Sequence, residues 1–253
     1  MELILMTAAS LLAGFIDAIV GGGGLVLLPS LFALFPNSPP AALLALSKSA
    51  GVCGTSIATI QFSRRVRLNW HALAPAACAG LFGSFLGAWT VTIVPNDVLR
   101  TALPFVLLAV LAYTLVKKDL GHQHAPRFGQ RGERIAATTA GLLIGFYDGF
   151  FGPGVGSFFV FVFVRVLGYD FLHASASAKL MNTATNVAAL TLFAIKGLIL
   201  WKYVAILAVA NIVGSLLGTR LALKHGSAFV RVIFILVVSA LILKTGYDAY
   251  RLH

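Results

Sequence analysis

The chain of 253 residues is 59% apolar and only 11% charged, and its mean hydropathy is +0.93. A soluble globular domain has about 45–50% apolar and about 25% charged residues, so most of this chain should meet lipid rather than water. The formal charge of +11 would suggest nucleic-acid binding in a soluble protein, but the basic residues lie mostly between the apolar segments. Composition therefore predicts a multi-pass membrane protein that has no nucleic-acid partner and no room for a soluble catalytic domain.

Eight apolar runs of membrane-spanning length follow one another, so we expect an all-α polytopic bundle. They cover residues 3–35, 42–62, 70–93, 98–116, 135–168, 172–195, 201–222 and 227–247. The first and fifth runs are too long for one crossing, and each is interrupted by glycines, at residues 21–24 and 152–156. An ordinary helix should not continue through such a sequence. We expect discontinuous or re-entrant helices at both places, with Met1-Glu2 opening a mature segment rather than a cleaved signal.

The two halves of the chain are related by a shift of 131 positions without a gap. The shift superimposes Gly14 on Gly145, Asp17 on Asp148, Gly21 on Gly152, Lys48 on Lys179, Trp70 on Trp201 and Gly87 on Gly218. Apolar similarity alone would not align charges, tryptophans and glycines. We predict a tandem duplication of a four-segment unit, with repeats at 1–116 and 135–253 and a polar cytoplasmic linker at 117–134.

The orientation of the second repeat depends on how the first and fifth runs cross the membrane. If all eight runs cross, the repeats are parallel; if these two are re-entrant hairpins, three crossings per half invert the second repeat. The positive-inside rule gives the same excess of basic residues for both arrangements. We favour inverted repeats, because about 15 residues per arm rise about 22 Å and pass the midplane when tilted.

Glycine-interrupted segments at corresponding places in two repeats point to a secondary transporter with its site at the repeat interface. Each second half-helix is expected to begin near Leu25 or Ser157, where unpaired N–H groups and the positive end of the helix dipole would cradle an anion. The alternative is that the small residues only allow tight helix packing. The candidate binding residues in the two loops are Gly21, Gly22, Gly23, Gly24, Gly152, Gly154, Gly156 and Ser157.

Lys48 and Lys179 are a second set of candidate anion ligands, since each lies inside an apolar run. A charge there costs at least about 2.5–3.5 kcal/mol on insertion scales, so each lysine should face a cavity or a partner. The alternatives are pairing with a buried aspartate or snorkelling to the interface. Near Lys179, the amides of Asn182 and Asn186 could donate hydrogen bonds to an oxyanion or hold helices together.

Asp17 and Asp148 each precede a glycine loop by four residues. Either could be a proton-coupling carboxylate, or an anchor that accepts N–H bonds from the broken loop. We prefer the anchor, because an ionised acid in contact with an anionic substrate would oppose binding.

No metal or cofactor site is predicted. Cys53 and Cys78 lie in apolar runs, the six histidines are scattered, and neither loop carries the Lys and Ser/Thr of a nucleotide-binding loop.

The segments GFIDAIVGGGG (14–24) and GFYDGFFGPGVG (145–156), each followed about thirty residues later by a lysine in a Ser/Ala/Thr-rich run, resemble the TauE/SafE sulfite exporter family, also called TSUP. The resemblance covers nearly the whole chain. It implies transport of small sulfur-containing anions, such as sulfite, sulfoacetate or other organosulfonates, across a bacterial inner membrane. One departure is that the first loop reads Gly22-Gly23-Gly24 where the second reads Pro153-Gly154-Val155, so the two loops need not contribute equally.

Together these features predict a secondary anion transporter that is not an enzyme and whose partners are a small anionic substrate and the lipid bilayer. No Ser/His/Asp or metal set lies at membrane depth, which argues against catalysis. The alternative function is a passive small-anion channel. The direction of transport, proton coupling and a homodimeric state stay open.

Overall fold

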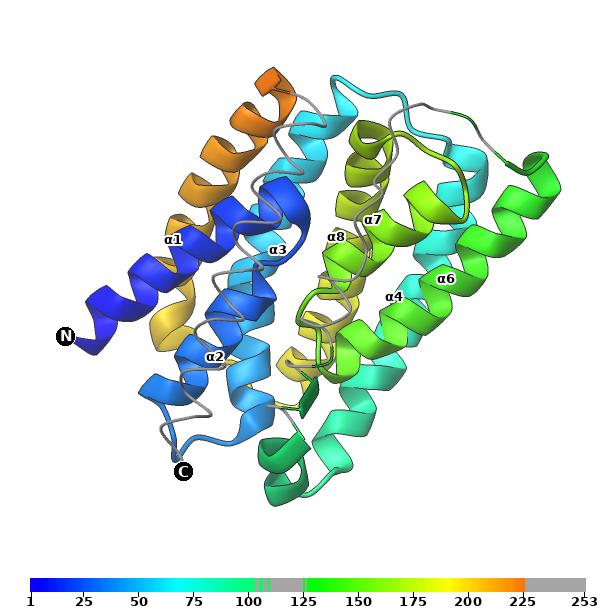
Figure 1. Cartoon of the computed structure of the whole chain (residues 1–253). Coiled ribbons are helices and arrows are strands. Elements are labelled where there is room, and N and C mark those ends of the chain that lie inside the picture. The colour runs from blue at the N-terminus through cyan, green and yellow to red at the C-terminus, as the bar shows by residue number, and fades with distance from the viewer. Residues whose placement is uncertain (103–104, 107–108, 110–124, 126, 226–253) are drawn as a thin grey trace.

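The computed structural model describes residues 1–102, 105–106, 109, 125 and 127–225, and this part of the chain contains helices and no strand. The labelled helices are α1 (Glu2–Val20), α2 (Gly24–Leu34), α3 (Pro40–Ser63), α4 (Trp70–Ile93), α6 (Gln130–Phe150), α7 (Val155–Arg165) and α8 (Phe171–Ile195) (Figure 1). Residues 96–102 and Trp201–His225 are also helical. Most of the expected linker and the apolar run at 227–247 lie outside the described residues.

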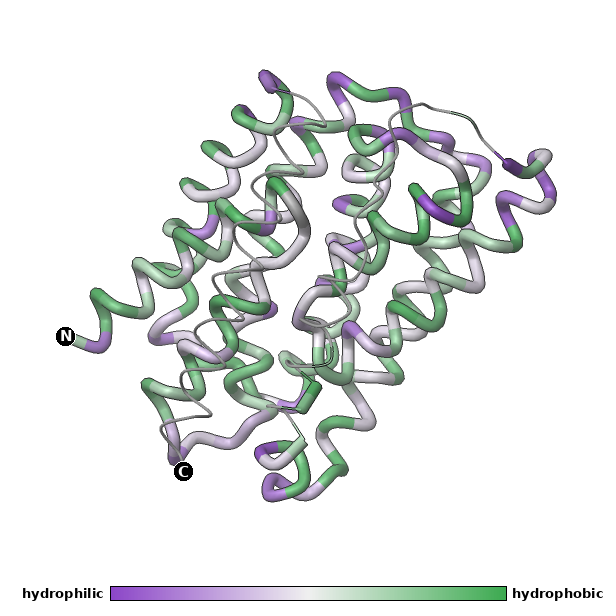
Figure 2. The backbone as a smooth tube through the Cα atoms, viewed as in Figure 1, coloured by the Kyte–Doolittle hydropathy of each residue, from purple (hydrophilic) through white to green (hydrophobic). Residues whose placement is uncertain are grey.

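Four of these helices contain segments long and apolar enough to cross a membrane. They are Glu2–Ile19, Pro40–Ser63, Trp70–Ile93 and Trp201–His225. Hydrophilic residues gather at the two ends of the bundle, while the middle parts of the helices are mainly apolar (Figure 2). Trp70 and Trp201 are exposed at the first residue of their helices, which suits anchoring at the membrane interface. The helices confirm a multi-pass membrane protein.

Both apolar runs that contain glycine breaks form helical hairpins, in which α2 turns back beside α1 and α7 turns back beside α6 (Figure 1). The first break passes through Gly21, which has a φ of 78°, and the second through Gly152 and Gly154, with φ of 88° and 76°. A residue with a Cβ is strained in this left-handed region, which is why glycine occupies these turns. The second arms begin at Gly24 and Val155, slightly before the expected starts near Leu25 and Ser157.

Each hairpin packs against a long helix from the other half of the chain. α4 and α6 pack closely against each other, and a Cβ on Gly149 would overlap the carbonyl oxygen of Ser84. The helix at Trp201–His225 approaches α1 as closely: a Cβ on Gly214 would overlap the carbonyl oxygen of Leu11. Small residues therefore bring the backbones of these helices into contact.

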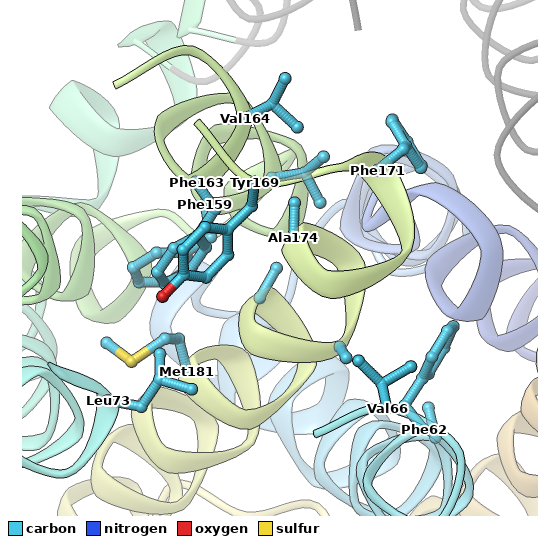
Figure 3. Packing of buried hydrophobic residues seen from close by; sticks show 14 of the residues in the cluster. Phe62, Val66, Leu73, Phe159, Phe163, Val164, Tyr169, Phe171, Ala174 and Met181 are labelled. Carbon is cyan, nitrogen blue, oxygen red and sulfur yellow. The ribbon is translucent and has the colours of Figure 1, made fainter. Parts of the chain in front are cut away.

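Aromatic residues of α7 pack on α8 and on the segment between them, and Phe62 and Val66 at the end of α3 belong to the same buried cluster (Figure 3). The rings of Phe163 and Tyr169 stack with their centroids 5.7 Å apart. Asp170 then caps α8, accepting hydrogen bonds from the backbone N–H groups of Leu172 and His173 at 2.8 and 3.0 Å. This cap sets the start of the helix that carries Lys179, Asn182 and Asn186.

A buried carboxylate ties the beginning of α6 to two neighbouring segments. Glu133 accepts hydrogen bonds from the amide of Asn69, at 2.9 Å, and from the hydroxyl of Tyr169. Burial and the adjacent Glu133 carboxylate raise the pKa of Tyr169, so its hydroxyl stays protonated and donates across the physiological range. The contact holds α6, the helix that carries Asp148, in place against α4.

Gly149→Ala should loosen the α4–α6 contact. Overpacking of this kind costs about 1–3 kcal/mol, so the melting temperature in detergent should fall clearly. Gly129→Ala is the matched control, because nothing lies within 4 Å of a Cβ at that position. Equal melting temperatures for the two variants would contradict the packing.

The contribution of Asp170 to stability should depend on pH. Burial alone would raise the pKa of Asp170, but the N–H groups of His173 and Leu172 and the interaction with the His173 ring outweigh it and lower that pKa. The cap therefore stabilises the fold above the unfolded pKa of about 3.9 and is lost as the pH falls through the lower folded value. Asp170→Ala should cost about 0.5–2 kcal/mol at neutral pH, measured by denaturation in detergent. A difference from the parent protein that stays constant down to pH 3 would contradict this role.

Candidate functional site

A cavity of about 50 Å³ lies where the two hairpins meet α3, α8 and the helix at Trp201–His225. Such a space holds a few water molecules, at about 10–15 Å³ each by this measure, or a small oxyanion. Its polar and glycine lining consists of Asp17, Gly21, Gly23, Gly24, Ser47, Lys48, Gly51, Thr55, Asp148, Gly152, Asn182, Asn186 and Asn211. Residues from both halves of the chain therefore build one site.

Two helices begin at this cavity. α2 starts at Gly24 and α7 at Val155, both of which line the cavity, and neither helix has a side-chain cap. The first turn of a helix leaves N–H groups without intrahelical partners and carries the positive end of the helix dipole. The two hairpins therefore bring two positive helix ends to the same small space.

The two glycine loops touch each other through their backbones. A Cβ on Gly21 would overlap the backbone of Gly156, and a Cβ on Gly24 would lie 3.2 Å from the Cα of Pro153. The hydroxyl of Tyr147 donates to the carbonyl of Pro153 at 2.8 Å and steadies the second loop. Close backbone contact between the loops is possible only because side chains are absent at Gly21 and Gly156.

The two buried lysines reach across from one half of the chain to the other. Lys48 on α3 donates to Oδ1 of Asp148 on α6. Lys179 on α8 donates to Asp17 on α1, both to its backbone carbonyl and, at 3.0 Å, to Oδ2. The lysines are only 7% and 1% exposed. Pairing with an aspartate, one of the alternatives drawn from the sequence, is thus present at both lysines, with a buried partner for Lys48 and a partly buried one for Lys179.

The two pairs differ in their relation to the cavity. Lys48 and Asp148 both line it, whereas Lys179 does not. Asp17 accepts the N–H of Gly23 through Oδ1 at 3.3 Å, which is the anchoring contact expected for this residue. Oδ2 of Asp148 is buried and has no hydrogen-bond partner among the described residues.

Three amide side chains complete the polar lining. Asn186 donates to Oδ1 of Asn182 at 3.2 Å, and Asn211 donates to the carbonyl of Ser10 at 3.1 Å. Asn211 was not among the residues named from the sequence, although an amide inside an apolar run of membrane-spanning length is the signal that could have identified it.

The paired charges leave this site close to neutral. Each lysine lies against one aspartate, so the ion pairs add no net positive charge for an anion. The helix ends, which carry about half a charge each, and the amide N–H groups supply the remaining attraction.

The structure brings together most of the candidate residues named from the sequence. Asp17, Gly21, Gly23, Gly24, Lys48, Asp148, Gly152, Asn182 and Asn186 line the cavity. Five of the candidates do not line the cavity: Gly22, Gly154, Gly156, Ser157 and Lys179. Within the described part of the chain, no group of three or more His, Cys, Asp or Glu side chains could hold a metal ion.

Comparison with known families agrees with this architecture. The pattern of the family described as sulfite exporter TauE/SafE matches residues 6–245, nearly the whole chain. The chain belongs to the TauE/SafE family. The probable membrane transporter protein ORF9 of Sinorhizobium sp is 36% identical to this TauE/SafE member over 97% of the chain and 93% of the relative.

Two further relatives carry similar names. The probable membrane transporter protein YfcA of Escherichia coli K12 is 36% identical, over 95% of this chain and 88% of its own length. A probable membrane transporter protein of Haemophilus influenzae is 32% identical, over 99% of this chain and 97% of its own length. No solved structure matches the chain. This TauE/SafE protein is therefore a membrane transporter.

Removing one member of the Lys179–Asp17 pair should destabilise the fold. Lys179→Met removes the cationic donor from a partly buried carboxylate and from a backbone carbonyl, at a cost of up to about 3–5 kcal/mol. The double variant Lys179→Met/Asp17→Asn should recover part of that loss, because no uncompensated charge remains. Denaturation in detergent measures both, with Lys196→Met as a control on an exposed lysine. A single variant as stable as Lys196→Met would contradict a structural role for this pair.

Proposed function

We propose that this TauE/SafE protein is a secondary transporter that carries a small sulfur-containing anion, such as sulfite, sulfoacetate or another organosulfonate, by alternating access. The observation that carries the proposal is the cavity where two positive helix ends meet the buried Lys48. The family description supports sulfite as the chemical type. Bacterial relatives support a place in the bacterial inner membrane.

We also propose that the two halves are inverted repeats. In Figure 1, α3 runs upward and α8, at the corresponding place in the second half, runs downward. The hydroxyl of Ser84 donates to the carbonyl of Thr185 at 2.7 Å, and the hydroxyl of Ser215 donates to the carbonyl of Gly54 at 2.7 Å. A shift of 131 positions turns one contact into the other with the halves exchanged. Contacts that recur in this way support a two-fold relation, about which one part of the bundle could rock against the rest.

In this proposal the substrate oxygens take hydrogen bonds from Lys48 and are attracted by the positive ends of α2 and α7. The N–H groups of Leu25, Val26 and Val155 already donate to the carbonyls of Gly22, Gly23 and Gly152. Glycines at 21, 23, 24 and 152 let the anion approach the backbone. Asn182 and Asn186 add amide donors on the α8 side of the cavity. The donors come from several sides of the cavity, which suits an anion with several equivalent oxygens. The cavity is small, so a small anion fits it better than a long organic substrate does.

Uptake of labelled anions into proteoliposomes tests the substrate class. Sulfite or sulfoacetate should show saturable uptake, and zwitterionic taurine should not, because it offers the site no net negative charge. Lys48→Met should lower the uptake at least tenfold, while Lys196→Met should leave it unchanged. Flux that rises without saturation would favour the alternative function, a passive anion channel. Absence of uptake for every sulfur anion tested would overturn the substrate class.

A further inference from the structure

The two lysine–aspartate pairs occupy equivalent positions in the sequence but have different surroundings. The carboxylate of Asp17 is fully used, because Oδ1 accepts the N–H of Gly23 and Oδ2 accepts Lys179. The carboxylate of Asp148 is 1% exposed and bonds Lys48 through Oδ1 alone. Its Oδ2 has no partner in the described part of the chain. Only Asp148 therefore has a vacant acceptor atom.

The sequences of the two loops explain this difference. Gly23 has right-handed helical backbone angles, with a φ of −57°, and directs its N–H to Asp17. The equivalent Gly154 is left-handed, with a φ of 76°, and the residue before it is Pro153, which has no N–H. The second loop thus gives Asp148 no hydrogen bond corresponding to the one that holds Asp17.

We propose that Asp148 binds the co-transported proton and that Asp17 does not, which makes transport a symport of one proton with one anion, electroneutral for a monovalent anion such as hydrogen sulfite. An arriving anion takes the place of the Asp148 carboxylate on Nζ of Lys48. A proton from the solution then adds to the Asp148 carboxylate, and no other bond forms or breaks. This inference rests on the proposed function and specifies its driving ion.

Charge balance in the cavity is the reason for the coupling. The empty site holds one lysine cation and one aspartate anion, and the loaded site would hold the cation, the substrate anion and a neutral acid. The net charge is the same in both states. An anion that entered without a proton would leave an extra negative charge buried in a medium of low dielectric constant, beside the carboxylate of Asp17. Burying such an uncompensated charge is strongly unfavourable.

The groups around Asp148 are consistent with this role. Lys48 faces it from α3 and Asp17 from α1, and the charge of Asp17 is compensated by Lys179. The hydroxyl of Thr185, on α8, lies within reach of the Asp148 carboxylate and donates to the carbonyl of Asn182 at 3.1 Å. In this geometry Oδ2 of Asp148 has no hydrogen bond within the described part of the chain. Lys179 does not line the cavity and holds the end of α1 through the Asp17 carbonyl, so its pair has a structural task.

Proteoliposomes with a pH gradient provide the test. With one proton per anion, a gradient of one pH unit should accumulate the anion about tenfold. Asp148→Asn should abolish this accumulation and the accompanying alkalinisation of the outer medium, while measurable exchange of internal for external anion persists. Asp17→Asn should melt at a lower temperature but keep its coupling in the folded fraction. Asp97→Asn is the control on an exposed acid.

Anion binding gives a second readout that does not depend on transport rates. Binding takes up one proton in this proposal. In the parent protein the Kd should therefore rise about tenfold for each unit by which the pH is raised, over the range in which Asp148 is ionised in the empty site. In Asp148→Asn the Kd should be independent of pH. Normal accumulation in Asp148→Asn, or uncoupling by Asp17→Asn, would overturn the assignment.

If Asp148→Asn does not fold, the proton-to-anion ratio measured on the parent protein tests whether anion transport is coupled to a proton. Anion uptake without proton movement would overturn the coupling and leave the proposed function intact. If no sulfur anion is carried at all, the proposed function fails, and the coupling inference fails with it.

Discussion

A charged side chain inside a membrane helix must have a partner of opposite charge, and this TauE/SafE protein takes each partner from the other half of the chain. Lys48 pairs with Asp148 and Lys179 pairs with Asp17, so α3 is tied to α6 and α8 to α1. These pairs place the ends of both hairpins around one cavity. The cost of burying an unpaired charge therefore keeps the two halves of the bundle together and determines where the site lies.

Backbone contacts between helices make this crossed arrangement possible. Gly149 on α6 and Gly214 on the helix at Trp201–His225 let each hairpin lie directly against a long helix of the other half. At the centre, Gly21 and Gly156 allow the two broken loops to touch. Side chains at these positions would separate the helices and move the lysines away from their aspartates, so packing and electrostatics support the same geometry.

The sequence was sufficient to predict the breaks at the two glycine loops, since no helix should continue through four glycines or through a Gly-Pro-Gly segment. It also identified the buried lysines and aspartates, because charges in apolar runs are few. It could not say which lysine faces the cavity, since Lys48 and Lys179 have similar local sequences and differ only in their three-dimensional surroundings. Asn211 is an amide in an apolar run and could have been named on that ground, but its contact with Ser10, distant in sequence, is visible only in the structure.

The difference between the loops was visible as Pro153 opposite Gly22, but its consequence was not. Only the structure shows that the Gly23 N–H reaches Asp17 while the Asp148 carboxylate keeps a vacant oxygen. Of the two pairs related by the shift of 131 positions, one holds the fold and, in our proposal, the other binds the substrate. We expect the anion to bind between the two glycine loops at Lys48. A structure determined with the transported anion bound tests this most directly. Density should lie within hydrogen-bonding distance of Lys48 Nζ and next to the starts of α2 and α7. Density at Lys179 or at the basic segment 64–67, with an empty cavity, would contradict this binding site.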